Sequence, residues 1–175
     1  MENQNVSTAA IGLVGLAVEY CRLIDNASQS DPQTFVRDIL RYLPRFYITL
    51  SDLSFLDGDT EENGAICQIM EEDSYDAARQ AMAAVFGEYD VYLDTPVEDM
   101  RFSDTPIGVS LSEQLADIYQ NMRDFAQTVR QMPHHMIPQA VQDLACRFNE
   151  FLSDTICSAL RAANSIYQNK LLPEQ

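Results

Sequence analysis

The sequence predicts an all-α, bundle-like domain of four main helices plus several short ones. Two observations support this prediction: apolar residues recur at steps of three and four along most of the chain, and no segment shows sustained alternation of apolar and polar residues. The 175 residues suffice for one self-supporting core, and no Pro/Gly/Ser-rich linker interrupts them. We therefore expect residues 1–175 to form a single helical domain.

The first helix is predicted over residues 6–24, where apolar side chains form one stripe at helical spacing. Gly12 and Gly15 lie inside this segment. Glycine lowers helix stability by up to about 1 kcal/mol relative to alanine, so its presence calls for a reason. We expect that another helix approaches closely at these two positions.

The second helix begins at the pair Asp31 and Pro32, because aspartate caps free N–H groups and proline fits the first helical position. Pro44 should kink or split this helix, since proline lacks the N–H that a helix needs. Residues 51–64 contain five acids and two glycines and are expected to form a loop. The apolar run at residues 65–70 is too short to classify. The inner face of the helix comprises Phe35, Ile39, Leu43, Phe46 and Leu50.

A third helix is expected between Asp73, as its cap, and Gly87, which suits the left-handed conformation at a helix C-terminus. Two Asp-Thr-Pro triplets follow, at residues 94–96 and 104–106. The first triplet continues into a capping box, which predicts a short helical turn ending near Arg101. The residues expected to be buried on the third helix are Tyr75, Ala78, Met82 and Phe86.

The clearest helical pattern follows a capping box at residues 110–113. Pro133 ends this helix, and a last helix is predicted from about Pro138 to about Gln168. A short connection makes two such helices antiparallel neighbours, so we expect their stripes to pack together. The first stripe comprises Leu111, Leu115, Ile118, Met122, Phe125, Val129 and Met132, and the second includes Leu144, Phe148 and Leu152.

The negative charge is concentrated in one region of the chain. Of the 27 acids, 15 lie between Asp52 and Asp104, where only Arg79 and Arg101 oppose them, so this region carries -13 of the net charge of -16. Nucleic acids and anionic membranes bind proteins through lysine and arginine, and the chain has a single lysine. We therefore expect neither as a partner, and we expect the acidic region to face another protein.

The four cysteines show no zinc-like spacing, and we expect them to be reduced thiols in the core. The apolar run at residues 9–18 follows Glu2 and no basic residue, and it is too short to span a bilayer. These features predict a cytoplasmic protein without a bound cofactor. The cysteines are Cys21, Cys67, Cys146 and Cys157.

Six acids form one candidate site. Glu113 and Asp117 lie four residues apart on one helical face and can hold a divalent cation with help from Glu98 and Asp99. Helical nucleotide pyrophosphohydrolases use paired carboxylates around Mg²⁺, with more glutamates on facing helices and basic residues for the phosphates, and neither is evident here. The alternative is that these acids cap helices, form turns and face solvent. The six are Asp94, Glu98, Asp99, Asp104, Glu113 and Asp117.

Aromatic residues are interleaved with acids in the same stretch. Tyrosine among acids is typical of a protein-binding surface, because its ring is apolar and its hydroxyl is polar. Tyr89 and Tyr92 are the best anchors of this kind. The alternative is that such rings hold an irregular segment against the bundle. His134 and His135 are expected to be exposed in a loop, and the sequence leaves their role open.

Residues 86–125 also carry a resemblance. The segments Tyr92-Leu93-Asp94, an acidic turn at residues 97–100, Ser-Asp-Thr-Pro at 103–106 and the run at 112–120 follow one another in this order. In this order they resemble a bacterial family of unknown function that is common in gut anaerobes. The resemblance implies a small helical cytosolic protein and no particular activity.

The leading hypothesis is a non-enzymatic helical module that binds another protein through an acidic, tyrosine-bearing face. The competing hypothesis is a divalent-metal-dependent hydrolase of a phosphorylated small molecule or nucleotide. A third possibility is a domain that only assembles with itself. Geometry separates the first two, because metal ligands must converge whereas an interaction face spreads its residues. The face comprises Tyr89, Asp90, Tyr92, Asp94, Glu98, Asp99, Asp104, Glu113 and Asp117.

Overall fold

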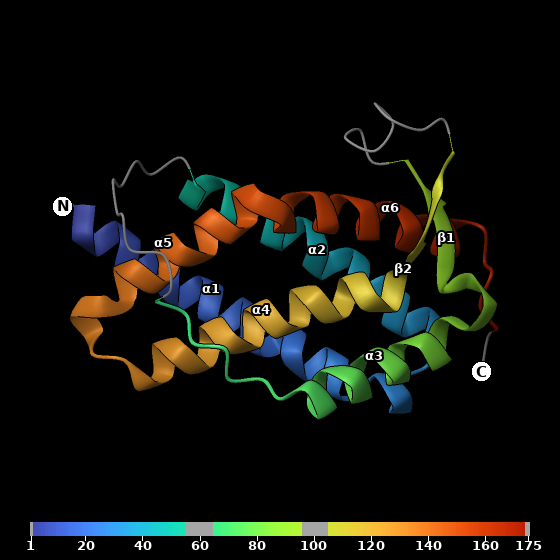
Figure 1. Cartoon of the computed structure of the whole chain (residues 1–175), viewed down its shortest axis with the longest axis horizontal. Coiled ribbons are helices and arrows are strands. Elements are labelled where there is room, and N and C mark those ends of the chain that lie inside the picture. The colour runs from blue at the N-terminus through green and yellow to red at the C-terminus, as the bar shows by residue number, and fades with distance from the viewer. Residues whose placement is uncertain (1, 55–64, 96–104, 174–175) are drawn as a thin grey trace.

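The computed structural model describes residues 2–54, 65–95 and 105–173. Its fold is all-α and bundle-like, as the sequence predicts, with a small two-stranded sheet at one end of the bundle (Figure 1). The buried apolar residues of the described segments belong to one core cluster, with the exception of Ala145. The α-helices are α1 (Glu2–Asp25), α2 (Pro32–Ser54), α3 (Glu72–Phe86), α4 (Leu111–Gln131), α5 (Ile137–Arg147) and α6 (Ser153–Gln168), and the strands are β1 (Val91–Asp94) and β2 (Ile107–Ser110).

Helices α1 and α2 bury the stripes that the sequence predicts. Asp31 caps α2, because its carboxylate accepts a hydrogen bond from the Thr34 N–H at 2.8 Å. All five predicted inner residues of α2 are fully buried, as are Leu13, Ala17 and Tyr20 of α1. This apolar burial supplies most of the stability of such helices.

Three expectations about these two helices are wrong. Gly12 and Gly15 face solvent, and a Cβ at either position would meet nothing within 4 Å, so no close helix contact explains them. Helix α2 is not split at Pro44, because it is helical from Pro32 to Ser54 with buried side chains on both sides of the proline. The helix also continues to Ser54 and takes in the start of the predicted loop, whose residues 55–64 lie outside the described part.

Helix α3 begins one residue before Asp73, which lies in its first turn instead of capping it. Gly87 ends the helix as predicted, with a positive φ of 58° that glycine adopts without strain. Of the four residues expected to be buried, Ala78, Met82 and Phe86 are buried, whereas Tyr75 is half-buried.

Helix α4 is capped as predicted by Ser110, whose Oγ accepts the Glu113 N–H at 3.2 Å. Its stripe is fully buried up to Phe125, and Val129 and Met132 are half-buried. The predicted last helix is continuous from α5 to α6, with a π-helical turn at Phe148–Leu152 between them. Short 3₁₀ turns lie at Ala27–Gln29, Gly87–Tyr89 and His134–Met136.

The strands β1 and β2 were not predicted. They form an antiparallel pair in which Val91 lies opposite Ser110 and Asp94 lies opposite Ile107. Four residues are too few to show the alternation by which a strand is predicted. The helical turn expected to end near Arg101 lies outside the described residues, apart from Thr95.

Residues 65–70 form a segment without regular secondary structure that side chains hold in place. The Ile66 N–H donates to Asp143 at 2.8 Å, and the N–H groups of Ile69 and Met70 donate to Asp124 Oδ1 at 3.0 and 2.9 Å. Buried backbone N–H groups need partners, and here two aspartates supply them in place of another strand.

All four cysteines are free, as expected, but they are not all in the core: Cys67 and Cys157 are exposed, and Cys21 and Cys146 are half-buried. None of the helices in the described residues is long and apolar enough to cross a membrane.

Candidate functional site

Two surface regions of the described chain carry features of a binding site. The first is the hairpin surface, which we define as the outward side of β1 and β2 and the adjoining pocket against α6. Val91 and Leu93 of β1 are 65% and 73% exposed. The pocket has a volume of about 380 Å³. Its lining includes Tyr89, Val91, Tyr92, Leu93, Ile166 and Leu171.

Asp90 fastens the hairpin to the start of α4. Its carboxylate accepts the Ser112 N–H at 2.7 Å and the hydroxyls of Ser112 and Ser110 at 2.8 and 3.0 Å. The Asp90 carbonyl also accepts the Leu111 N–H at 2.8 Å. A carboxylate at this position accepts hydrogen bonds from free N–H groups, and its negative charge is stabilised by the positive end of the helix dipole. Asp90 is therefore a buried structural anchor.

Asp94 fastens the other end of β1 to α6. Its carboxylate is buried, forms an ion pair with Arg161, and accepts hydrogen bonds from the Ser158 hydroxyl and from the Thr95 N–H at 2.7 Å. Burial by itself raises the pKa of Asp94, but these hydrogen bonds and the Arg161 charge lower it below the usual value. The carboxylate is thus held in its ionised form.

Tyr89 and Tyr92 both lie at the pocket, in different ways. The Tyr92 hydroxyl donates to Gln114 Oε1 at 2.7 Å and lies 2.7 Å from Ser158 Oγ, so its polar end is used inside the protein. Tyr89 is half-buried with its ring against the core, and the neighbouring Glu88 raises the pKa of its hydroxyl. Tyr89 is therefore more available than Tyr92 for contact with a partner.

The two remaining acids of the predicted site that the structure describes, Glu113 and Asp117, do not join this group. Asp117 accepts the Tyr75 hydroxyl at 2.7 Å, which connects α4 to α3, and Glu113 is exposed. Burial and the charge of Glu113 raise the pKa of Asp117, although the hydrogen bond from Tyr75 opposes that shift. Within residues 2–54, 65–95 and 105–173, no group of three or more His, Cys, Asp or Glu side chains could hold a metal ion. Glu98, Asp99 and Asp104 lie outside the described residues.

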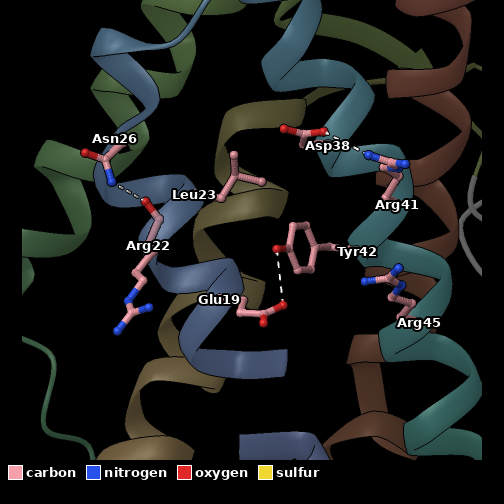
Figure 2. A pocket seen from close by; sticks show the side chains of 8 residues that line it. All are labelled: Glu19, Arg22, Leu23, Asn26, Asp38, Arg41, Tyr42 and Arg45. Carbon is pink, nitrogen blue, oxygen red and sulfur yellow. Dashed lines mark hydrogen bonds and ion pairs between the residues drawn. The ribbon is translucent and has the colours of Figure 1, made fainter. Parts of the chain in front are cut away.

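The second region is a pocket of about 560 Å³ between α1 and α2, which we call the arginine groove (Figure 2). Arg22 contributes to its lining from α1, with a side chain that extends away from α2, and Arg41 and Arg45 contribute from α2, one helical turn apart. The rest of the lining comprises Glu19, Leu23, Asn26, Asp38 and Tyr42.

The charges of the arginine groove are only partly paired. Arg41 lies 3.8 Å from Asp38, and the Tyr42 hydroxyl donates to Glu19 at 3.4 Å. Burial and the nearby Glu19 raise the pKa of Tyr42. The guanidinium groups of Arg22 and Arg45 have no ion-pair or hydrogen-bond partner among the described residues (Figure 2).

The sequence analysis did not predict this groove, because it considered the clustered acidic residues and not the arginines. A signal was nevertheless present: Arg37, Arg41 and Arg45 recur every four residues, which places them on one side of a helix. Together with Arg22 they are four of the 11 basic residues in a strongly acidic chain. His134 and His135, by contrast, are exposed in a 3₁₀ turn as expected.

Comparisons with known proteins bear on the fold. The family model described as "Domain of unknown function (DUF5063)" matches residues 4–169. The crystal structure of protein BF1032 from Bacteroides fragilis, a gut anaerobe, is similar with a TM-score of 0.72 and 24% identity, covering 89% of this chain and 90% of that one. At this identity the likeness shows the fold alone. No curated protein matches the chain. The predicted resemblance to an uncharacterised family is thereby confirmed.

Proposed function

The chain belongs to the DUF5063 family, and we propose that it is a non-enzymatic module that binds a protein partner through the hairpin surface. One observation carries the proposal: Val91 and Leu93 project into solvent beside a pocket with an apolar lining. Large apolar side chains that cluster at a concave surface are typical of interaction sites. Covering them contributes roughly 25 cal/mol for each Å² of apolar area removed from water.

The sheet itself favours an extended partner segment. It has two strands in the described part of the chain, so each strand has one edge without a neighbouring strand. An incoming chain can pair with such an edge through its backbone and place alternate side chains into a neighbouring pocket. Asp90 and Asp94 hold the hairpin at both ends of β1, so the surface is ready for binding without reordering.

The charges at the pocket favour one kind of partner. Glu88 and Arg161 both line the pocket, but Arg161 is paired with Asp94, so Glu88 is the charge that a partner meets. We therefore expect a partner segment that combines apolar anchors with flanking lysine or arginine residues. Association should be steered by this attraction and should slow as salt is added. A location in the cytoplasm belongs to the same proposal, and the free cysteines support it.

The test begins by identifying the partner. A photo-crosslinking residue placed at Leu93 should capture a protein from cells, whereas the same residue at Ile48, which is 60% exposed on α2, should not. The captured protein is then purified and titrated. Replacing Val91 and Leu93 together by serine should weaken its binding at least about tenfold, because apolar anchors carry most interface affinity.

Matched control variants are Ile11→Ser and Ile48→Ser, which remove exposed apolar side chains elsewhere. Equal losses in the controls, or no loss in the hairpin variant, would contradict the proposal. Tyr89→Ala serves as a second probe, since Tyr92→Ala would also remove the bonds to Gln114 and Ser158. If the captured protein is a second copy of this chain, sedimentation should show a dimer that the hairpin variant abolishes.

A further inference from the structure

The arginine groove concentrates positive charge on a chain that is otherwise negative. Its lining has three arginines against two acids, in a protein whose net charge is -16. Isolated arginines on a surface are ordinary, but these three line one concave volume between α1 and α2. Their arrangement concentrates positive potential at a point where the protein as a whole repels anions.

Two of the three guanidinium groups have no hydrogen-bond or ion-pair partner within the described part of the chain. Arg41 shares Asp38 with Arg37, but Arg22 and Arg45 have no side-chain partner among the described residues. A guanidinium presents five N–H donors in a planar fork that matches carboxylate and phosphate oxygens. The groove is therefore equipped to bind oxyanions with groups that the fold does not use.

We propose that the arginine groove binds a small molecule through its phosphate or carboxylate oxygens, with the hydroxyl or amino groups of that molecule held by Glu19 and Asp38. These two acids would repel a bare polyanion, and they accept hydrogen bonds from a ligand that also carries donors. Tyr42 and Leu23 add an aromatic face and an aliphatic side chain for the uncharged part of the ligand.

The size of the groove points to the same class of ligand. Its volume of about 560 Å³ lies in the range of small-molecule sites. Arg41 and Arg45 stand one helical turn apart on α2, and the side chain of Arg22 extends from α1 away from α2, so the donors are spread along the rim of the groove instead of meeting at one point (Figure 2). This spread suits a sugar phosphate, a nucleotide or a hydroxycarboxylate better than a single inorganic ion.

The experiment uses a panel of probes on the full chain. Ribose 5-phosphate, AMP, citrate and inorganic phosphate are titrated separately, at constant low ionic strength, while backbone amide shifts are recorded by NMR. We expect at least one organic probe to bind more tightly than inorganic phosphate, with the largest shifts in residues 19–26 and 38–45. Comparison of the titrations with the phosphate probes and with citrate shows which oxyanion the groove prefers.

Variants then locate the binding. Arg22→Gln and Arg45→Gln should each weaken the best probe about tenfold, and Arg45→Lys should weaken it less, because lysine keeps the charge and loses the fork. The matched control is Arg130→Gln, which removes an exposed arginine in the last turn of α4. Circular dichroism verifies that each variant folds.

The proposal is overturned if no organic probe binds, if the shifts fall outside α1 and α2, or if Arg130→Gln weakens binding as much as Arg45→Gln. Weaker binding of the same probe in both groove variants, with Arg130→Gln unchanged, supports it. This test does not involve the hairpin surface, so its failure leaves the proposed protein interaction standing.

Discussion

The hairpin surface and the arginine groove use charge in opposite ways. At the hairpin, Asp90 and Asp94 are buried, and their carboxylates are taken up by hydrogen bonds and an ion pair within the fold. In the groove, the guanidinium groups of Arg22 and Arg45 have no ion-pair or hydrogen-bond partner among the residues that the structure describes. The acidic stretch dominates the sequence by number of charges, yet two of its acids have an internal role. Charge density along a sequence therefore does not tell which charges a ligand can meet.

The difference follows from burial. A charge that loses water must gain partners, because an unpaired buried carboxylate is strongly unfavourable. Asp124 and Asp143 obey the same rule where they accept the N–H groups of residues 65–70. An exposed guanidinium is solvated and needs no such partner. Substitutions at the two regions should consequently affect different properties, stability at the hairpin and binding at the groove.

The largest expected effect compares Asp90→Ala with Arg45→Ala. Removing the Asp90 carboxylate leaves three donors without their acceptor, including the Ser112 N–H, and should lower the free energy of unfolding by about 2–4 kcal/mol. Arg45→Ala should change it by no more than about 0.5 kcal/mol. Urea unfolding followed by circular dichroism measures both. Similar losses in the two variants would break the comparison.

The second prediction concerns pH. Because the pKa of Asp94 is lowered in the folded protein, its contribution to stability is present above the ordinary value of 3.8 and is lost as pH falls through the lowered value. At neutral pH Asp94→Asn should cost about 1–2 kcal/mol. The difference in free energy of unfolding between wild type and variant should become smaller when the pH falls below the ordinary aspartate pKa of 3.8. The control is Asp52→Asn, which removes an exposed acid of α2.

The apolar part of the fold was predictable from sequence, and most of the site was not. Stripes such as Phe35 to Leu50 repeat within one helix, so local periodicity reveals them. The hydrogen bonds that hold residues 65–70 include one from the Ile66 N–H to Asp143, which is 77 positions from Ile66. No local pattern encodes such a pairing. For the same reason, the sequence indicates that Asp94 is acidic but cannot indicate that Arg161 neutralises it.

The third prediction is that salt has opposite effects on the stability of the acidic region and on binding in the arginine groove. Added NaCl should raise the melting temperature modestly between about 10 and 300 mM. Screening relieves repulsion among the acids between Asp52 and Asp104, where the net charge is -13. The same salt should weaken any oxyanion bound in the arginine groove. Differential scanning calorimetry and the NMR titration measure the two effects. A flat melting temperature would mean that the acids are already well separated or paired, and a further rise with Mg²⁺ at matched ionic strength would favour the metal hypothesis.

The smallest expected effect concerns Asp117, an acid that the fold accommodates less well than Asp90 or Asp94. Its pKa is raised by burial and by the charge of Glu113, against the hydrogen bond from Tyr75, so its ionised form is disfavoured in the folded protein. Stability should thus increase as pH falls through its raised pKa towards the unfolded value. Asp117→Asn keeps an acceptor for the Tyr75 hydroxyl and removes the charge, so we expect the melting temperature at neutral pH to rise by roughly 1–3 °C.

The gain from Asp117→Asn should shrink in acid, where the wild-type carboxyl is itself protonated. Glu113→Gln, which removes the neighbouring like charge, should give a smaller gain in the same direction. Scanning calorimetry of both variants across the acidic range measures this. A fall in melting temperature for Asp117→Asn would mean that the bond from Tyr75 needs a full negative charge, and would place Asp117 with Asp90 and Asp94 among the acids that stabilise the fold.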